Sequence, residues 1–350
     1  MKIITVNASK GYRVYIGNDI LSNLSDYIRN IKNPCRIAII SDSNVWPLYG
    51  ENAVQVLEQA GYKTIRYILP AGEESKNQHQ YFSILNFLAD NSITRSDLLI
   101  ALGGGVVGDI AGFAAATYLR GISYVQIPTS LLAMVDSSIG GKTAIDLPSG
   151  KNLAGAFYQP EAVLCDLSVL NTLPESVFID GCAEVIKYGV LFDASLFSHL
   201  VENGLAFDRE YVISRCISLK ADVVCADEFD KGLRQQLNLG HTIGHSIEKN
   251  SNFTITHGQA VSIGMAVIAK ACVKENLCNG SIYESISQLL STFQLPIQTH
   301  FNAFQITAAA LSDKKRTGDT IQLVLPRNIG ECFLHPVPVQ DLVSFIEKGL

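Results

Sequence analysis

The chain contains, at Leu98–Phe113, the stretch LLIALGGGVVGDIAGF, in which an apolar run leads into a glycine cluster and then into an alanine-rich segment. Such an order is typical of a buried parallel strand followed by a helix. Gly103, Gly105 and Gly108 also fit G-x-G-x-x-G, in which the backbone and a helix N-terminus approach an anionic group. The acidic ribose ligand of that motif is missing, since Arg120 stands near its position. A tight packing turn therefore stays open as an alternative for this stretch alone.

Three further β-branched runs alternate with helical stretches in the first half of the chain, at Arg36–Ser41, Thr64–Leu69 and Tyr124–Ile127. This alternation predicts βαβ units and a mostly parallel sheet, whose ligands bind beyond the carboxyl ends of the strands. Two of the runs are followed by polar groups suited to ribose and adenine, in Ser41–Asn44 and Gly72–Lys76. A nucleotide that spans several strand ends accounts for these loops and for the glycine cluster together.

The pattern changes near Thr172, where apolar residues begin to recur at i, i+3, i+4 and i+7, as on one face of a helix. The helices predicted from this period lie at Ala183–Leu191, Tyr211–Val224, Ala260–Val273 and Ile282–Phe293. We therefore expect an α/β nucleotide-binding domain with a mostly parallel sheet at residues 1–171, and an all-α metal-binding domain at residues 172–350.

Composition limits the classes of partner. The chain has 350 residues, of which 47% are hydrophobic and 17% charged, so two domains can each bury a core. Lys and Arg number 27 against 33 Asp and Glu, a net charge of −6 that disfavours nucleic acid as a partner. We find no signal-peptide pattern and no long apolar window, and we expect a cytoplasmic protein with no membrane partner. Eight scattered cysteines are expected to be free thiols.

A histidine cluster in the second half suggests a metal site. His241 and His245 are one helical turn apart, and His257 follows twelve residues later. Two histidines at i and i+4 are the usual helical half of a zinc site, but no acidic residue lies between them, unlike in the peptidase motif H-E-x-x-H. Glu184 is a candidate for a further ligand because a carboxylate in an apolar helix is costly unless it is paired or binds metal. Its alternative is an ion pair with Lys187 or Lys220.

Cations are concentrated in and beside these motifs, although the chain as a whole is acidic. They are Arg120, Lys142, Lys151, Lys187, Lys220, Arg234 and the pair Lys314–Lys315. Such a set suits a phosphorylated, carboxylated small molecule. Solvated surface charge is the alternative for any single member.

An ordered series of motifs runs through nearly the whole chain: LPAGEESK, GGGVVGDIAGF, YLRG, VQIPTSLLAMVDSSIGGKTAID, GKNLAGAF, AEVIK, GLRQQLNLGHTIGH and HGQAVSIGM. Through these motifs the chain resembles the 3-dehydroquinate synthase family, whose members are NAD- and metal-dependent sugar phosphate cyclases of the shikimate pathway. The resemblance implies a carbon–oxygen lyase that converts 3-deoxy-D-arabino-heptulosonate 7-phosphate to 3-dehydroquinate and phosphate. Its steps would be transient oxidation by NAD, phosphate elimination, reduction, ring opening and an intramolecular aldol reaction. It also implies an active site between two domains and a homodimer.

The resemblance further assigns roles to residues. Glu184, His241 and His257 would bind Zn²⁺ or Co²⁺, and His245 would be left for proton transfer or substrate. The residues expected to bind NAD are Asp42, Asn44, Ala71, Gly72, Glu73, Lys76, Gly104, Gly105, Val106, Val107, Gly108, Asp109, Thr129, Ser130, Lys142, Lys151 and Thr172. Those expected to hold the substrate are Asp136, Lys142, Asn152, Lys187, Lys220, Arg234, Asn238 and one lysine of the pair Lys314–Lys315, of which we take Lys314. Arg120 would reach the neighbouring site across the dimer interface.

The sequence departs from the family pattern at a few positions. Ser130 replaces a threonine and keeps the hydroxyl group, whereas Ser176–Val177 stands where the family commonly has Arg-Glu. Cys182 has no assigned role. Three alternative functions stay open: a sister cyclase such as 2-deoxy-scyllo-inosose synthase, a polyol dehydrogenase that exchanges NADH with solvent, and a ligand sensor that binds without turnover. Asn238 and the intact segment Asp136–Thr143 favour dehydroquinate synthase over the sisters.

Overall fold

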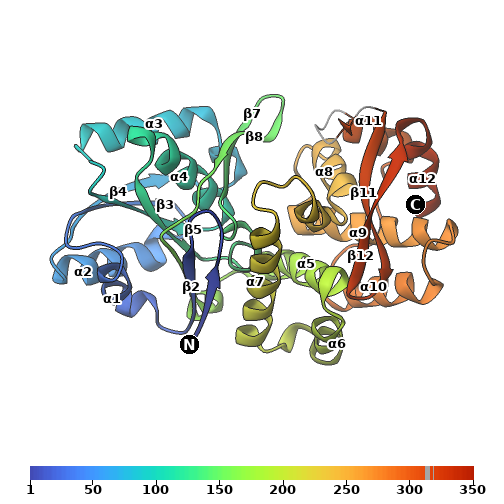
Figure 1. Cartoon of the computed structure of the whole chain (residues 1–350), viewed down its shortest axis with the longest axis horizontal. Coiled ribbons are helices and arrows are strands. Elements are labelled where there is room, and N and C mark those ends of the chain that lie inside the picture. Colours follow the sequence, from blue (N-terminus) through green and yellow to red (C-terminus); the bar gives the residue numbers. More distant parts are fainter. Residues whose placement is uncertain (312–315, 318) are drawn as a thin grey trace. The chain divides into compact units, whose positions relative to one another are not determined.

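A computed structural model of the chain describes residues 1–311, 316–317 and 319–350 (Figure 1). The chain divides into two compact units. The first contains Met1–Leu173 and Lys220–Phe229, and the second contains Pro174–Leu219 and Asp230–Leu350. Among the residues described, every helix is too short or too polar to cross a membrane.

The first unit is built on a seven-stranded sheet. Its strands are β1 (Lys2–Val6), β2 (Tyr12–Gly17), β3 (Arg36–Asp42), β4 (Lys63–Leu69), β5 (Leu98–Gly103), β6 (Ser123–Pro128) and β9 (Ala162–Asp166). They lie in the order β1-β2-β9-β6-β5-β3-β4, and every neighbouring pair is parallel except β1 with β2. The predicted parallel sheet and its four predicted strands are thus confirmed.

The middle of this sheet is fully covered, which explains the apolar run from which the fold was predicted. All six residues of β5 are buried. Helix α4 (Gly105–Thr117) packs on β5 and β6, and α3 (Gln78–Asp90) packs beside α4 (Figure 1). Helices α1 (Leu24–Arg29) and α2 (Glu51–Gln59) lie in the same unit. A hairpin of β7 (Lys142–Leu147) and β8 (Gly150–Phe157) also belongs to the unit and packs against α4.

The strand order creates a topological switch point. From β3 the chain passes to β4 on one side, whereas β5 lies on the other side of β3. The loops after β3 and β5 therefore lead away from each other at the carboxyl ends of the strands. Ligands of open parallel sheets bind at such a point.

The second unit is mainly helical, as predicted. Its helices are α5 (Glu175–Phe192), α6 (Ala194–Asn203), α8 (His241–Asn250), α9 (His257–Lys274), α10 (Gly280–Thr292), α11 (Ala303–Leu311) and α12 (Leu342–Gly349). Helix α7 (Arg209–Ala226) begins in this unit, but its last turns belong to the first unit. Just after them, Glu228 accepts hydrogen bonds from the backbone N–H and the hydroxyl group of Ser9, both at 2.7 Å.

The second unit also contains a three-stranded antiparallel sheet, which the all-α expectation for this domain did not include. Its strands are β10 (Arg316–Thr317), β11 (Thr320–Asn328) and β12 (Glu331–Pro338). Strand β11 packs on α9, and β12 packs on α5. A local signal was present, because Gly330, at φ 86°, forms the tight turn between β11 and β12. These two strands have nine and eight residues, and the prediction assigned the whole second half to helices because it followed only the helical period.

Candidate metal centre and nucleotide loops

Two close contacts between helices shape the candidate metal centre. A Cβ atom on Gly264 would lie 2.0 Å from the carbonyl oxygen of Gly240, so glycine is needed for α9 to approach the start of α8. A Cβ atom on Gly258 would lie 1.9 Å from the carbonyl oxygen of Asp180, so glycine is equally needed where α9 meets α5. The three helices that carry the candidate ligands are therefore held together at backbone distance.

The start of α9 is also fixed by hydrogen bonds that it donates to the side chain of Asp180 on α5. Its carboxylate accepts the backbone N–H of Gln259 at 3.1 Å and the hydroxyl group of Thr256. Thr256 and Gln259 also form a capping box, which satisfies free donors of the first turn. Asp180 lies one turn before Glu184, so α5 holds the beginning of α9 on the same face that carries this candidate ligand.

These contacts bring Glu184, His241 and His257 together. Oε1 of Glu184 lies 3.5 Å from Nε2 of His241 and 3.6 Å from Nε2 of His257, and the three ligand atoms lie within 4.8 Å of one another. Donor atoms around a tetrahedral zinc ion with bonds near 2.1 Å are roughly 3.4 Å apart. The donor set of one carboxylate and two imidazoles therefore fits a divalent transition metal in both chemistry and spacing.

The other nitrogen of each imidazole has its own partner. Nδ1 of His241 is 3.0 Å from the carbonyl oxygen of Leu239, and Nδ1 of His257 is 3.3 Å from Oε2 of Glu248. Such partners fix the ring orientation and direct Nε2 toward the ligand position. Burial alone lowers the pKa of His257, but hydrogen bonds to Glu184 and Glu248 outweigh it and raise the pKa to about 10. A metal ion would therefore displace a proton from this ring.

Glu184 takes part in two arrangements at once. Its side chain is 1% exposed and forms an ion pair with Lys187 on the next turn of α5, which is equally buried. The alternative predicted for this residue is thus present beside the two imidazoles. The other predicted partner, Lys220, belongs to the first unit, where its Nζ lies 2.7 Å from both Oδ1 and the backbone oxygen of Asp136.

A second group of candidate ligands shares His257 with the first. His245, Glu248 and His257 also place their ligand atoms within 4.8 Å of one another. Sequence reasoning missed Glu248, although a signal was present in the spacing. Glu248 lies seven residues after His241 and three after His245, which places all three on one face of α8.

Most of the predicted NAD residues lie at the carboxyl ends of the parallel strands, whereas Lys142 and Lys151 lie on the hairpin of β7 and β8. Asp42 ends β3 and Asn44 follows it, Ala71–Lys76 follow β4, Gly104 follows β5, Gly105–Asp109 begin α4, and Thr129 and Ser130 follow β6. Val106 and Val107 lie in the first turn of α4, and Thr172 follows the turn after β9. The backbone joins some of these loops, since Thr129 donates its N–H to the carbonyl oxygen of Gly103 at 3.0 Å.

A buried ion pair joins the loop after β4 to helix α4. Nζ of Lys76 lies 2.8 Å from Oδ2 of Asp109 and 3.7 Å from Oε1 of Glu73. Burial alone lowers the pKa of Lys76, but the carboxylates of Asp109 and Glu73 outweigh it, and the pKa is raised. Lys151 on β8 lies 3.5 Å from the same Glu73 oxygen. Four predicted residues, from the loop after β4, helix α4 and strand β8, thus form one charged network.

The remaining predicted residues are placed singly. In the second unit, Arg234 is 1% exposed, and Asn238 donates to the carbonyl oxygen of Gln235 at 3.0 Å in the short helical turn just before α8. In the first unit, Lys142 is exposed at the start of β7, and Asn152 has φ 55°. Arg120 is exposed at φ 66°. Lys314 lies outside the described residues.

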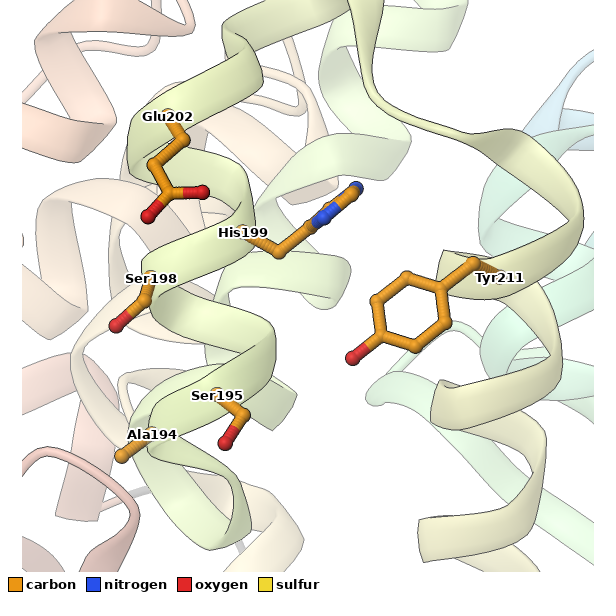
Figure 2. Close-up of a pocket in the computed structure, with 6 residues that line it drawn as sticks. All are labelled: Ala194, Ser195, Ser198, His199, Glu202 and Tyr211. Atoms are coloured by element: carbon orange, nitrogen blue, oxygen red, sulfur yellow. The ribbon is translucent and has the colours of Figure 1, made fainter.

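A separate surface pocket lies between α6 and α7 (Figure 2). It is lined by Ala194, Ser195, Ser198, His199, Glu202 and Tyr211. The rings of His199 and Tyr211 meet edge to face at 4.8 Å. Since no lysine or arginine is among the lining residues, the pocket lacks the charge that a phosphorylated ligand needs.

Two family models match consecutive parts of the chain. The model for 3-dehydroquinate synthase N-terminal matches residues 66–180, and the model for 3-dehydroquinate synthase C-terminal matches residues 181–316. The chain belongs to the 3-dehydroquinate synthase family. The resemblance drawn from the motifs is thereby confirmed. Within the family, the 3-dehydroquinate synthase of Streptococcus suis is 41% identical over 98% of this chain and 99% of the relative.

Solved structures of related cyclases share the fold of this family member. A 2-deoxy-scyllo-inosose synthase complexed with carbaglucose-6-phosphate, NAD⁺ and Co²⁺ matches with a TM-score of 0.88 and 26% identity over the whole of both chains. A 2-epi-5-epi-valiolone synthase from Streptomyces hygroscopicus with NAD⁺ and Zn²⁺ bound matches with the same score and identity over 96% of this chain and 95% of that chain. Both are sister cyclases, and identity to the dehydroquinate synthase is higher.

Proposed function

We propose that the chain is a 3-dehydroquinate synthase, a lyase that converts 3-deoxy-D-arabino-heptulosonate 7-phosphate to 3-dehydroquinate and phosphate. The observation that carries this proposal is the cluster of Glu184, His241 and His257, at 3.5 and 3.6 Å, in a chain that aligns from end to end with a relative of that name. The reaction is redox-neutral overall, since the hydride taken from the substrate is returned to it.

Glu184, His241 and His257 would hold a divalent cation, Zn²⁺ or Co²⁺, and the loops at the strand ends would hold NAD. When bound, the cation supplies a Lewis acid that polarises a substrate hydroxyl group, and NAD⁺ supplies a temporary hydride acceptor. For NAD, the support is the position of the loops at the switch point and the N–H groups at the start of α4, which suit a pyrophosphate.

The cations of both units would bind and orient the substrate. Lys220 is already held by the carboxylate and the backbone oxygen of Asp136, which lowers the entropy that it loses on binding a phosphate or carboxylate group. Lys187 is fixed in the same way by Glu184. His245, on the same helix face as His241, would hold or move a proton of the substrate.

We further propose a cytoplasmic homodimer in which Arg120 reaches the neighbouring site. Its support is the exposure of Arg120 at a left-handed backbone position, which presents the side chain outward at a conformation that is costly for a non-glycine residue. Light scattering of the purified protein should give twice the chain mass, and a monomer would contradict this part of the proposal.

The activity is tested by phosphate release from 3-deoxy-D-arabino-heptulosonate 7-phosphate, with and without NAD⁺ and a chelator, while absorbance follows NADH. We expect release that requires both NAD⁺ and metal, without NADH accumulation. Net NADH accumulation with an alcohol would indicate a polyol dehydrogenase. No release from a protein that binds NAD and metal would instead indicate a sister cyclase with another sugar phosphate.

The metal ligands are tested separately because His257 belongs to two groups. We expect His241→Ala and His257→Ala to lower Zn²⁺ affinity by about 100-fold or more, since even partners of metal ligands contribute roughly 10–100-fold. His245→Ala should retain the metal. If His245→Ala loses metal and His241→Ala keeps it, the ion belongs to the second group, with His245 and Glu248. Chelator competition measures each affinity.

A further inference from the structure

We propose that Glu248 is a positioning residue for the metal centre, which fixes the ring of His257 with Nε2 directed toward Glu184. The inference deepens the proposed function and rests on it. It begins with geometry: Oε2 of Glu248 lies 3.3 Å from Nδ1 of His257, while Nε2 on the opposite side of the ring lies 3.6 Å from Glu184. A hydrogen bond from Nδ1–H to a carboxylate leaves Nε2 as the electron-pair donor.

The carboxylate of Glu248 lies where a negative charge is costly, so a role in the stability of the fold alone does not account for it. It is 2% exposed, and a buried carboxylate is costly unless it is paired. It also lies near the C-terminal end of α8, where the helix dipole disfavours a negative charge. The imidazole of His257 supplies a compensating interaction for this carboxylate. A role in orienting a metal ligand therefore accounts for a carboxylate at this position.

The main chain of Glu248 holds the beginning of the connection that leads to His257. Its carbonyl oxygen accepts the backbone N–H of Phe253 at 2.8 Å and the hydroxyl group of Ser251 at 2.9 Å, which folds the connection from α8 to α9 back onto α8. That connection ends at His257, the first residue of α9. Glu248 thus contacts both the connection that leads to His257, through its carbonyl oxygen, and the ring of His257, through its carboxylate.

The two imidazoles differ in their outer partners, and this difference predicts unequal sensitivity. Nδ1 of His241 meets the backbone carbonyl oxygen of Leu239, which no side-chain substitution removes. Nδ1 of His257 meets a side chain that can be changed. A carboxylate also makes its imidazole a stronger base than a neutral carbonyl group does, so Glu248 should strengthen metal binding beyond orientation alone.

The test measures the Kd of Zn²⁺ by chelator competition in the full-length protein, for the wild type, Glu248→Gln and Glu248→Leu. Gln keeps the size and one acceptor oxygen but loses the charge, and Leu loses both. We expect affinity to fall about 10-fold for Gln and up to about 100-fold for Leu. Ser246→Ala is the matched control, since Ser246 is buried on the same helix and donates to the carbonyl oxygen of Thr242. It should bind like the wild type.

A second readout separates positioning from direct ligation. At saturating Co²⁺, the visible absorption band of Glu248→Gln should keep the wild-type intensity, because the ligands themselves are unchanged. A changed band would make Glu248 a ligand and overturn the positioning role. Equal Zn²⁺ affinity of the wild type and Glu248→Gln would overturn the inference while the proposed function stands. If the wild type binds no metal, the proposed metal centre fails and the inference fails with it.

Discussion

The nucleotide loops and the metal cluster are built in opposite ways. In the first unit, the candidate groups lie on loops that follow parallel strands, and the sheet alone brings their starting points to one edge. In the second unit, the candidate groups are side chains on three separate helices, and glycine contacts hold those helices together. The strand order thus places the first set of groups, whereas the second set depends on the close backbone contacts at Gly258 and Gly264.

Each site nevertheless contains a buried lysine–carboxylate pair, Lys76 with Asp109 and Lys187 with Glu184. In the first unit the pair joins the loop after β4 to helix α4, and in the second it joins two turns of one helix. The pair of Lys76 and Asp109 should therefore stabilise the fold of the first unit, whereas the pair of Lys187 and Glu184 should mainly set the charge at the metal cluster. Because the two sites are held by different contacts, a variant that disturbs one site should leave ligand binding at the other unchanged, and the variants below test this.

The largest effect is expected from Lys76→Met, which leaves the carboxylate of Asp109 in its buried position without this cation. We expect the free energy of unfolding to fall by about 3 kcal/mol, because breaking a buried pair by removing one partner leaves an uncompensated charge. NAD⁺ binding should weaken, and Zn²⁺ affinity should stay the same. Urea unfolding and separate titrations with the two ligands measure this.

Lys10→Met is the matched control for that variant. Lys10 pairs with Glu161 at 2.8 Å, but its side chain is 42% exposed, so the cost should stay below about 1 kcal/mol. A loss of Zn²⁺ affinity in Lys76→Met equal to its loss of NAD⁺ affinity would show that the two sites are not built independently.

Gly258→Ala should weaken Zn²⁺ binding and leave NAD⁺ binding unchanged, and it should lower stability somewhat less than Lys76→Met does. The added Cβ would lie 1.9 Å from the carbonyl oxygen of Asp180, so α9 has to move away from α5 and carry His257 with it. We expect about 2 kcal/mol of lost stability from this overpacking, with weaker Zn²⁺ binding and unchanged NAD⁺ binding. Gly280→Ala, where the nearest atom is Val273 Cγ1 at 3.9 Å, should change none of these quantities. Wild-type Zn²⁺ affinity in Gly258→Ala would contradict the dependence on helix contacts.

The smallest effect is expected from Asp97→Asn, at the amino ends of the strands and so at the opposite edge of the sheet from the nucleotide loops. The Asp97 carboxylate accepts backbone N–H groups of Arg36 at 2.9 Å and Thr94 at 2.7 Å. Burial alone raises the pKa of Asp97, but these hydrogen bonds outweigh it and lower the pKa below its ordinary value. A lowered pKa in the folded state contributes stability that is present above about pH 4 and lost as the pH falls through the folded-state value.

The variant should therefore be about 1 kcal/mol less stable than the wild type at pH 7, and the difference should shrink toward about pH 3. Urea unfolding at both pH values measures it, with Asp90→Asn, at the exposed end of α3, as the control. A difference that grows on acidification would contradict this assignment. NAD⁺ affinity should not change, and a change would mean that the nucleotide site depends on the far edge of the sheet.

The existence and type of these elements were predictable from the sequence, but their ends were less so. The continuous apolar run LLIALG matches β5, whereas the helix predicted at Ala183–Leu191 begins eight residues earlier, at Glu175. The role of Lys76 as a link to Asp109 was not predictable, since it depends on how the fold brings the loop after β4 to α4. Glu248 was missed for a related reason: its partner lies on the next helix, and only the turn between α8 and α9 brings the two together. The domain boundaries and the roles of the site residues stay predictions.

Because Lys220–Phe229 belong to the first unit, the order in which the ribosome makes the chain limits when this unit can fold. Glu228 holds Ser9 and also accepts a hydrogen bond from Gln159 at 2.9 Å, so the N-terminal unit is joined by a segment made well after its sheet. A nascent chain cannot complete this unit until that segment has left the ribosome, although domains that are contiguous in sequence can finish folding first. The first unit should thus finish folding only after residue 229 has left the ribosome, and a fragment ending at residue 173 should expose the surface that the missing segment covers.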